Sequence, residues 1–476
     1  MGLMFTQADF LASLPLMAIS VLALIVMVLE GTIKKGENIV FGVSLAGLAI
    51  TAGIVGSISG LHVVGFQGML LGGGYAAIFN MLFVIVCAST ILFSKSYLEK
   101  EGINYGEYYA LLLFATAGMM MMASALDLIM VFLGIELMSV CLYVLAGFFR
   151  KRIKSNESAL KYFLLGSFAT GFLLYGIALI YGATETTNFS VIVQRIPQLQ
   201  QPVLFWIGVS LLVIGFSFKV AAVPFHMWVP DVYEGAPTPV SGFMSTGAKA
   251  AAFSALLLFF SQAITVNLPR LIEVFAILSA ASMIVGNIFA LAQKNIKRML
   301  AYSSIAHAGY ILSGVTASNT LGQIGVIYYL VAYSFMNLGA FGVLSILEKD
   351  EDKNLTFDDY LGLWHRKPVL ASLMALFMFS LAGIPPFAGF FGKYYVFAAA
   401  VSSGFTWLAV IGVLASLVSV YYYLHLVVVM FFNDPDKKEE IEVPITGIIA
   451  LLISAIIIVV IGLFPSTILQ FTRSLF

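Results

Sequence analysis

Four lysines lie inside long apolar stretches of the sequence, where a charged side chain is costly. They are Lys161, Lys219, Lys249 and Lys393. A lysine at the centre of a membrane helix costs about 2.5 to 3.5 kcal/mol on insertion scales, so it persists there only with a partner, water or a role. Glu136 is the one acidic residue that we place deep in an apolar run, about 12 Å from its start. We therefore expect Glu136 to be the counter-ion of Lys219.

These residue types are suited to carrying protons through a low-dielectric interior. A nearby carboxylate favours the charged form of a lysine and burial favours the neutral form, so a changing distance between Glu136 and Lys219 would make the amine alternately hold and release a proton. His307, in the stretch AYSSIAHAGYILSG, could relay protons, although a core histidine satisfied by its neighbours explains it as well. Lys161 has Glu157 four residues before it, so a surface ion pair is an equal alternative for this lysine.

Other kinds of chemistry lack their usual residues in this sequence. There is no glycine-rich phosphate loop, no cluster of cysteines and histidines with ligand spacing, and no nucleophile elbow. Cys87 and Cys141 lie singly in apolar runs. The 24 basic and 24 acidic residues balance, and no basic run is interleaved with aromatics, so we expect no nucleic-acid partner. The sequence predicts neither redox chemistry nor hydrolysis in this chain alone.

Two segments combine a buried lysine with a proline break. Residues 203–233 would measure about 46 Å as one helix, against a hydrocarbon core of about 30 Å. Pro224 removes a backbone donor and clashes with the preceding turn, so we predict two half-helices that meet near Lys219 in mid-membrane. Residues 368–400 are also too long, and they carry a Pro-Pro pair near their middle with Lys393 just beyond. Paired broken helices are typical of ion pathways in transporters built from repeats.

The elements that position these residues are membrane helices. Hydrophobic residues make up 61% of the chain and charged residues 10%, which indicates an all-α polytopic membrane protein that lies in a lipid bilayer. The apolar runs are continuous rather than alternating and about twice too long for barrel strands. We count fourteen spans, near residues 11–29, 39–58, 75–93, 108–125, 128–148, 159–181, 203–225, 238–260, 271–292, 299–316, 321–347, 368–400, 405–432 and 445–469.

The basic residues between the spans predict the orientation of the chain. Alternate connections hold seventeen of them, which are Lys34, Lys35, Lys95, Lys100, Arg150, Lys151, Arg152, Lys154, Lys294, Lys297, Arg298, Lys349, Lys353, Arg366, Lys367, Lys437 and Lys438. The remaining connections and the termini hold three, which are Arg195, Arg270 and Arg473. Because cytoplasmic loops carry the excess of basic residues, we expect both termini to lie outside.

Four sequence stretches resemble a known family. They are KVAAVPFHMWVPDVYEGAPTPVSGFMSTGAKAAAF around Lys219 and Lys249, GIELMSV around Glu136, KRMLAYSSIAHAGY around His307, and SLAGIPPFAGFFGKYYVF around Lys393. Together they are similar to the antiporter-like N subunits of proton-translocating NADH:quinone oxidoreductase, respiratory complex I. The resemblance covers essentially the whole chain. The related L and M subunits and the Mrp antiporters share the element around Lys219, but the form MWVPDVYEGAPTPV with lysines at 249 and 393 resembles the N type. The chain stops seven residues after its last predicted span, so we expect no long lateral helix, which disfavours the L type more than the M type.

The resemblance implies two inverted five-helix repeats, each with one broken helix. The chain then divides into residues 1–107 with spans one to three, 108–270 with the first repeat, 271–432 with the second repeat, and 433–476 with the last span. Residue by residue, the resemblance assigns the candidate site. Glu136 and Lys219 match the coupling pair, Lys161 and Lys249 the hydrophilic axis, and Lys393 the terminal proton donor, with His307 between Lys249 and Lys393.

The resemblance also implies partners and a cellular location. NAD, FMN, iron–sulfur clusters and quinone are expected in other subunits, and none of these cofactors in this chain. The expected neighbours are an M-type subunit and small K-, J- and A-type subunits, in the inner (plasma) membrane of a bacterium. Three alternatives stay open: an Mrp-like cation/proton antiporter subunit, a subunit of a related complex fed by ferredoxin or another donor, and a passive scaffold. Since sodium prefers carboxylates and carbonyls, a single deep carboxylate disfavours the antiporter.

Overall fold

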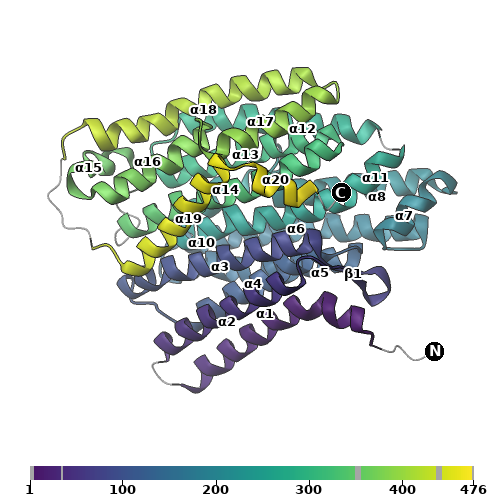
Figure 1. Cartoon of the computed structure of the whole chain (residues 1–476), viewed down its shortest axis with the longest axis horizontal. Coiled ribbons are helices and arrows are strands. Elements are labelled where there is room, and N and C mark those ends of the chain that lie inside the picture. The colour runs from purple at the N-terminus through teal and green to yellow at the C-terminus, as the bar shows by residue number, and fades with distance from the viewer. Residues whose placement is uncertain (1–4, 34–35, 268, 349–354, 436–441, 474–476) are drawn as a thin grey trace.

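The computed structural model describes residues 5–33, 36–267, 269–348, 355–435 and 442–473, and of 261–270 and 471 it describes the backbone at most. Most of these residues lie in long helices that run side by side and form one bundle (Figure 1). The predicted all-α class is therefore confirmed. One addition is a short hairpin that packs against the first helix, in which β1 (His62–Gly65) pairs antiparallel with β2 (Leu70–Gly73).

The helices follow one another in the order of the predicted spans. The first half of the chain holds α1 (Gln7–Thr32), α2 (Glu37–Ile58), α3 (Gly74–Lys100), α4 (Gly106–Ser124), α5 (Leu128–Ala146), α6 (Ile153–Thr184), α7 (Phe189–Arg195), α8 (Pro202–Val220), α9 (Trp228–Gly235), α10 (Thr238–Phe243) and α11 (Lys249–Asn267). The second half holds α12 (Pro269–Leu291), α13 (Ile296–Ala317), α14 (Thr320–Leu347), α15 (Leu363–Arg366), α16 (Pro368–Ala382), α17 (Ala388–Ser402), α18 (Thr406–Phe432), α19 (Ile445–Leu463) and α20 (Ser466–Arg473). A π-helix, Met244–Ala248, joins α10 to α11.

Eleven helical segments in the described part of the chain are long and apolar enough to cross a membrane. Each of them coincides with one of the fourteen predicted spans. The other three predicted spans correspond to α4, to α13, and to α16 with α17. Helices α16 and α17 have only 15 residues each, because the chain breaks between them. Helix α13 is less apolar because Lys297, Arg298, His307 and several serines lie on it.

Both predicted helix breaks are present, and they divide their elements into parts of different length. Helix α8 ends at Val220, where Ala221 adopts a left-handed φ of 65°, and the indole nitrogen of Trp228 donates to the Phe218 carbonyl at 3.2 Å. The two parts of this element, α8 and α9, have 19 and 8 residues, and α8 ends one residue after Lys219, near which we predicted the break. Helix α16 ends at Ala382, where Gly383 has a φ of 86°, and here the halves are equal.

The centre of the bundle is α14, which is buried along nearly its whole length and packs against α3, α10, α16, α17 and α19. Elsewhere, glycines bring helices close together. A methyl group at Gly118 of α4 would lie 2.7 Å from the Gly134 carbonyl oxygen of α5, and Gly176 and Gly208 face each other in the same way between α6 and α8. Small residues at helix contacts are the usual means of close packing in membranes.

One end of the bundle, which we call the basic end, is marked by Lys100, Arg152, Lys154 and Arg298. Ion pairs from Arg152 to Glu101 and from Lys154 and Arg298 to a shared carboxylate, Glu234, join α3, α6, α9 and α13 there. The marks for the N- and C-termini both lie in the right-hand half of Figure 1, away from α15 at the left.

Some of the basic residues that predicted the orientation lie outside the described part of the chain, and others lie in helices rather than in loops. Lys34, Lys35, Lys349, Lys353, Lys437 and Lys438 lie outside the described residues, and the side chains of Arg270 and Arg473 are not described. The placement in loops is wrong for Lys95, Lys100, Lys154, Arg195, Lys297, Arg298 and Arg366, which lie in helices. Among these seven, Lys297 is the buried one. It is the second residue of α13 and is fully buried, and its ammonium donates to the Ala236 carbonyl at 2.7 Å.

Candidate functional site

Four of the six predicted site residues are buried in the helix bundle. The exposed fractions are 7% for Lys219, 2% for Lys249, 1% for His307 and 5% for Lys393. They come from α8, α11, α13 and α17. Each must therefore find its hydrogen bonds inside the protein, because an unsatisfied buried charge is very costly.

Lys219 is held by a hydroxyl group. It lies in the last turn of α8, and its ammonium donates to Ser139 Oγ of α5 at 2.8 Å. Ser139 in turn donates to the Ile135 carbonyl at 2.5 Å. The rings of Tyr143 and Phe218 lie 6.0 and 5.8 Å from the ammonium, within the range of a cation–π attraction.

Glu136 is not in direct contact with Lys219. In the described chain, no ion pair within 4.0 Å joins the two side chains, and Glu136 is partly exposed. The carboxylate still interacts electrostatically with Lys219, and Ser139 lies three residues after it on the same face of α5. The expected counter-ion therefore acts at longer range, with a hydroxyl as the contacting group.

Lys249 follows directly on the π-helix at the start of α11. Its ammonium donates to the Ser304 carbonyl of α13 at 2.6 Å, and the Tyr333 ring lies 5.8 Å away. A π-helix changes the direction in which the next side chains point and is frequent at functional sites. Here it precedes the residue that reaches across to the second predicted repeat.

His307 lies between two tyrosine hydroxyls. Nδ1 is 2.9 Å from the Tyr329 hydroxyl and Nε2 is 3.1 Å from the Tyr423 hydroxyl. Both Lys249 and Lys393 interact electrostatically with this imidazole. The histidine is satisfied by its neighbours, and those neighbours are themselves groups that can donate and accept protons.

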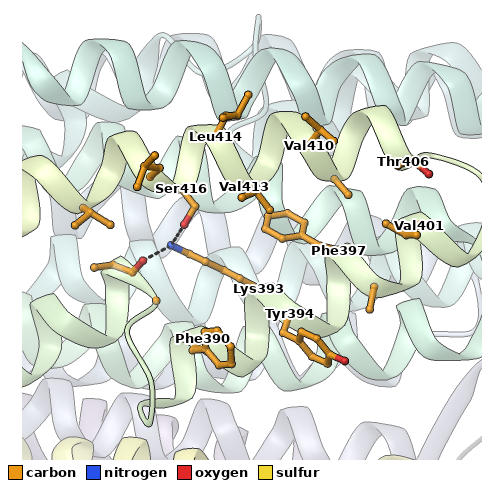
Figure 2. Close-up of a pocket in the computed structure, with 16 residues that line it drawn as sticks. Phe390, Lys393, Tyr394, Phe397, Val401, Thr406, Val410, Val413, Leu414 and Ser416 are labelled. Carbon is orange, nitrogen blue, oxygen red and sulfur yellow. Dashed lines mark hydrogen bonds between the residues drawn. The ribbon is translucent and has the colours of Figure 1, made fainter.

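Lys393 binds the end of the broken helix. Its ammonium donates to the carbonyls of Leu381 and Ala382 at 3.0 and 2.9 Å. It also donates to Ser416 Oγ at 2.7 Å, as Figure 2 shows. The last carbonyls of a helix lack intrahelical partners and carry a partial negative charge. The break after Ala382 thus creates the acceptors that a buried ammonium needs.

An apolar cavity of about 700 Å³ opens beside Lys393. Phe390, Tyr394, Val413 and Leu414 are among its lining residues, and the Lys393 side chain runs past them toward Ser416 (Figure 2).

A chain of hydroxyl and amide groups links this half of the site, and the sequence reasoning missed it. Asn287 donates to the Tyr310 hydroxyl at 2.9 Å and accepts from the Tyr422 hydroxyl at 2.9 Å. The Tyr310 ring lies 5.1 Å from the Lys393 ammonium, and the Tyr423 hydroxyl bonds to Ser303 as well as to His307. The sequence feature that could have predicted these hydroxyl groups is the high number of tyrosines in apolar runs, as in YYYLH at 421–425.

Lys161 belongs to a different cluster at the basic end. Its side chain is 39% exposed and pairs with Glu157 at 2.6 Å and Asp231 at 2.7 Å. Asp231 and Glu234 each also pair with Arg298 at 2.8 Å. The structure thus places Lys161 in a partly exposed network of ion pairs, as the surface interpretation expected.

The charges of this cluster shift the pKa values of its carboxyl groups. Burial opposes ionisation of Asp231, but hydrogen bonds from Lys161 and Arg298 outweigh it, and the pKa of Asp231 lies below its ordinary value. Burial is likewise outweighed at Glu234 by Arg298 and Lys154, which lower the pKa of that carboxyl. Both groups are therefore held as carboxylates.

Two buried carboxyl groups were not expected. Asp127 is 3% exposed and caps α5, accepting from the Ile129 backbone at 2.8 Å and from the Thr187 hydroxyl at 2.7 Å. Glu348, at the end of α14, is 1% exposed. Both lie at helix ends, where side-chain packing buries them, whereas Glu136 lies inside α5. Within the described residues, no cluster of histidine, cysteine and acidic side chains could hold a metal ion.

Comparison with known proteins places these features in a family. Residues 125–419 match the family described as NADH:quinone oxidoreductase/Mrp antiporter, TM. The chain belongs to this family. It is 45% identical to NADH-quinone oxidoreductase subunit N of Trichlorobacter lovleyi over 99% of its own length and 97% of that protein. Subunit N 1 of Chloroherpeton thalassium is 44% identical over 98% of both chains.

Solved structures agree with this family membership. A chain of respiratory complex I from Thermus thermophilus has a TM-score of 0.84 and 35% identity, with 96% of this chain and 98% of that chain covered. The fold is shared more widely. A chain of an archaeal membrane-bound sulfane sulfur reductase matches with a TM-score of 0.86 at 24% identity over 98% of this chain and 96% of that one. The predicted family is confirmed.

Proposed function

We propose that this chain is the proton-conducting N subunit of an NADH:quinone oxidoreductase. The observation that carries the proposal is the set of buried, hydrogen-bonded groups Lys219, Lys249, His307 and Lys393. Lys219 contacts a hydroxyl, Lys249 a carbonyl of α13, and His307 two hydroxyls, so each can lose or gain a proton by small movements of its neighbours. The N-type relatives supply the expected link to quinone reduction.

In this proposal Glu136 and Lys219 control proton entry into the first half. A closer approach of the Glu136 carboxylate would stabilise the Lys219 ammonium, and a withdrawal would favour transfer of its proton toward Lys249. His307 and the tyrosine hydroxyls would carry the proton on to Lys393. Lys161 would hold the basic end through its ion pairs rather than carry protons.

The architecture of the proposal follows the resemblance. Residues 108–270 and 271–432 form the two inverted repeats, flanked by 1–107 and 433–476, in fourteen spans with both termini outside. The chain would lie in the bacterial plasma membrane between an M-type subunit and small K-, J- and A-type subunits. NAD, FMN, iron–sulfur clusters and quinone would be bound by other subunits of the complex.

The test is Lys249→Ala in the assembled complex, with proton pumping and quinone reduction measured in the same vesicles. General acid–base groups contribute about 10²- to 10⁴-fold, so pumping should fall by about a hundredfold. Lys154→Ala is the matched control, since that lysine forms an exposed ion pair with Glu234 at the basic end. Full pumping in an assembled Lys249→Ala complex would contradict the proposal.

A further inference from the structure

The buried carboxyl group of Glu348 is not used by the function proposed above. Glu348 caps the end of α14, and its Oε2 accepts a hydrogen bond from the hydroxyl of Thr238, the first residue of α10. The hydroxyls of Tyr97 and Tyr360 interact with it electrostatically. A carboxyl group that is 1% exposed and lies among hydroxyls resembles a proton-binding site more than a surface charge.

Glu348 is close to the surface of the basic end. The ammonium of Lys100, which is exposed at the end of α3, donates to the backbone carbonyl of Glu348. This contact places the backbone of Glu348 next to an exposed side chain of the basic end.

Hydroxyl groups lead from Glu348 toward Lys249. Thr238, Ser241 and Ser245 are fully buried, and their spacing of three and four residues places them near one another on one side of the helix. Lys249 follows Ser245 by four residues, directly after the π-helix. Neighbouring side chains on such a face are about 5 to 6 Å apart at Cβ. That gap is one that a single water molecule can bridge.

The far end of this row is tied to the groups around Lys249. Asn337 of α14 donates to Ser245 Oγ at 2.7 Å and to the Tyr333 hydroxyl at 3.0 Å. The Tyr333 ring lies 5.8 Å from the Lys249 ammonium and 4.9 Å from the His307 ring. The row therefore joins the basic end to the centre of the candidate site.

We infer that Glu348 is a proton-loading residue that supplies Lys249 from the basic end through the hydroxyls of Thr238, Ser241 and Ser245. The Glu348 carboxylate binds a proton from water and becomes a carboxylic acid. It passes that proton to the Thr238 side of the row, each hydroxyl accepts one proton and releases another, and the neutral Lys249 amine takes the last one to become an ammonium. Glu348 then returns to the carboxylate. This inference rests on the proposed proton-conducting function.

The experiment compares Glu348→Gln, Glu348→Asp and Ser245→Ala in the assembled complex, with NADH-driven proton pumping and quinone reduction measured in proteoliposomes. Glutamine keeps the size of the side chain and an oxygen that can accept from Thr238, but it cannot carry a proton. We expect Glu348→Gln to lower both rates by about tenfold or more, in line with the contribution of acid–base groups. Glu348→Asp should retain most activity, and Ser245→Ala should behave like the glutamine variant.

Glu101→Gln is the matched control, because Glu101 lies at the end of α3 near Lys100 and pairs with Arg152 at 2.5 Å. Normal pumping by Glu348→Gln would overturn the inference. Equal losses in the aspartate and glutamine variants would also overturn it, since they would show that the size of the Glu348 side chain matters and its ability to carry a proton does not. Lys249→Ala separates the two proposals: if it abolishes pumping while Glu348→Gln does not, only the inference about Glu348 fails.

Discussion

At the scale of single residues, the buried cations are stabilised mainly by neutral acceptors. Lys219 contacts the Ser139 hydroxyl, Lys249 a backbone carbonyl, and Lys393 two carbonyls and a hydroxyl. Neutral partners suit a group that must release its proton, because a contacting carboxylate would hold the ammonium tightly. Glu136 at longer range can then change the proton affinity of Lys219 without trapping the charge.

Ser139→Ala tests the contact to Lys219. The substitution removes the hydroxyl that accepts a charged hydrogen bond from Lys219. Such a bond is worth about 1.5 to 3 kcal/mol, so proton pumping should fall by about tenfold or more. Ser210→Ala on α8 is the control, because its exposed hydroxyl donates to the Trp206 carbonyl of its own helix. Pumping by Ser139→Ala at the level of the Ser210→Ala control would show that the serine does not position Lys219.

The sequence alone predicted the buried lysines but not their partners. Lys219, Lys249 and Lys393 were visible because a cation within an apolar run is rare and costly. Tyrosines such as Tyr329 and Tyr423 are common in apolar helices, so their hydroxyl contacts with His307 depend on tertiary packing. Lys297 was misplaced because its position near a helix start resembles a loop in the sequence.

At the scale of secondary structure, each helix break lies next to a buried lysine. Helix α8 ends one residue after Lys219, and the carbonyls at the end of α16 accept hydrogen bonds from Lys393. Prolines predicted both breaks, since proline removes a backbone donor. The lengths of the two parts could not be predicted, because the end of α8 is set by the left-handed Ala221 and by the indole of Trp228. The π-helix before Lys249 also had no sequence signal.

Gly389→Ala tests the packing of the second break. A methyl group at Gly389 of α17 would lie 1.8 Å from the Ser380 carbonyl oxygen of α16, so the two helix ends must separate. Overpacking of this kind costs about 1 to 3 kcal/mol and would move the carbonyls away from Lys393. We expect pumping and the melting temperature of the chain to fall together.

Gly171→Ala is the control for this substitution, because nothing lies within 4 Å of the added methyl group in the middle of α6. Equal activity and equal stability of the two variants would mean that the close contact between α16 and α17 is not needed.

At the scale of the whole molecule, the basic end joins the two predicted repeats. Arg298 of α13 pairs with Asp231 and Glu234 of α9, and its neighbour Lys297 donates to the Ala236 carbonyl. Both carboxyl groups have lowered pKa values in the folded chain. Their stabilising effect is therefore present above the ordinary carboxyl pKa values and is lost as the pH falls through the lowered values.

Arg298→Gln tests this pH dependence. The variant should melt at a lower temperature than the unmodified chain at neutral pH, and the difference should shrink below a pH of about 4, where both carboxyl groups become protonated in the unfolded chain. Thermal unfolding in detergent, followed by intrinsic fluorescence across this pH range, measures the difference. A gap that stays constant with pH would show that the ion pairs contribute no pH-dependent stability.

The most direct test of the account is proton pumping and quinone reduction measured side by side in membranes that carry Lys219→Ala in the assembled complex. We predict that both fall together, by about a hundredfold or more, because the lysine lies on a path that is tightly coupled to turnover. If neither rate changes while the complex remains assembled, Lys219 is a structural residue and the chain does not conduct protons through it.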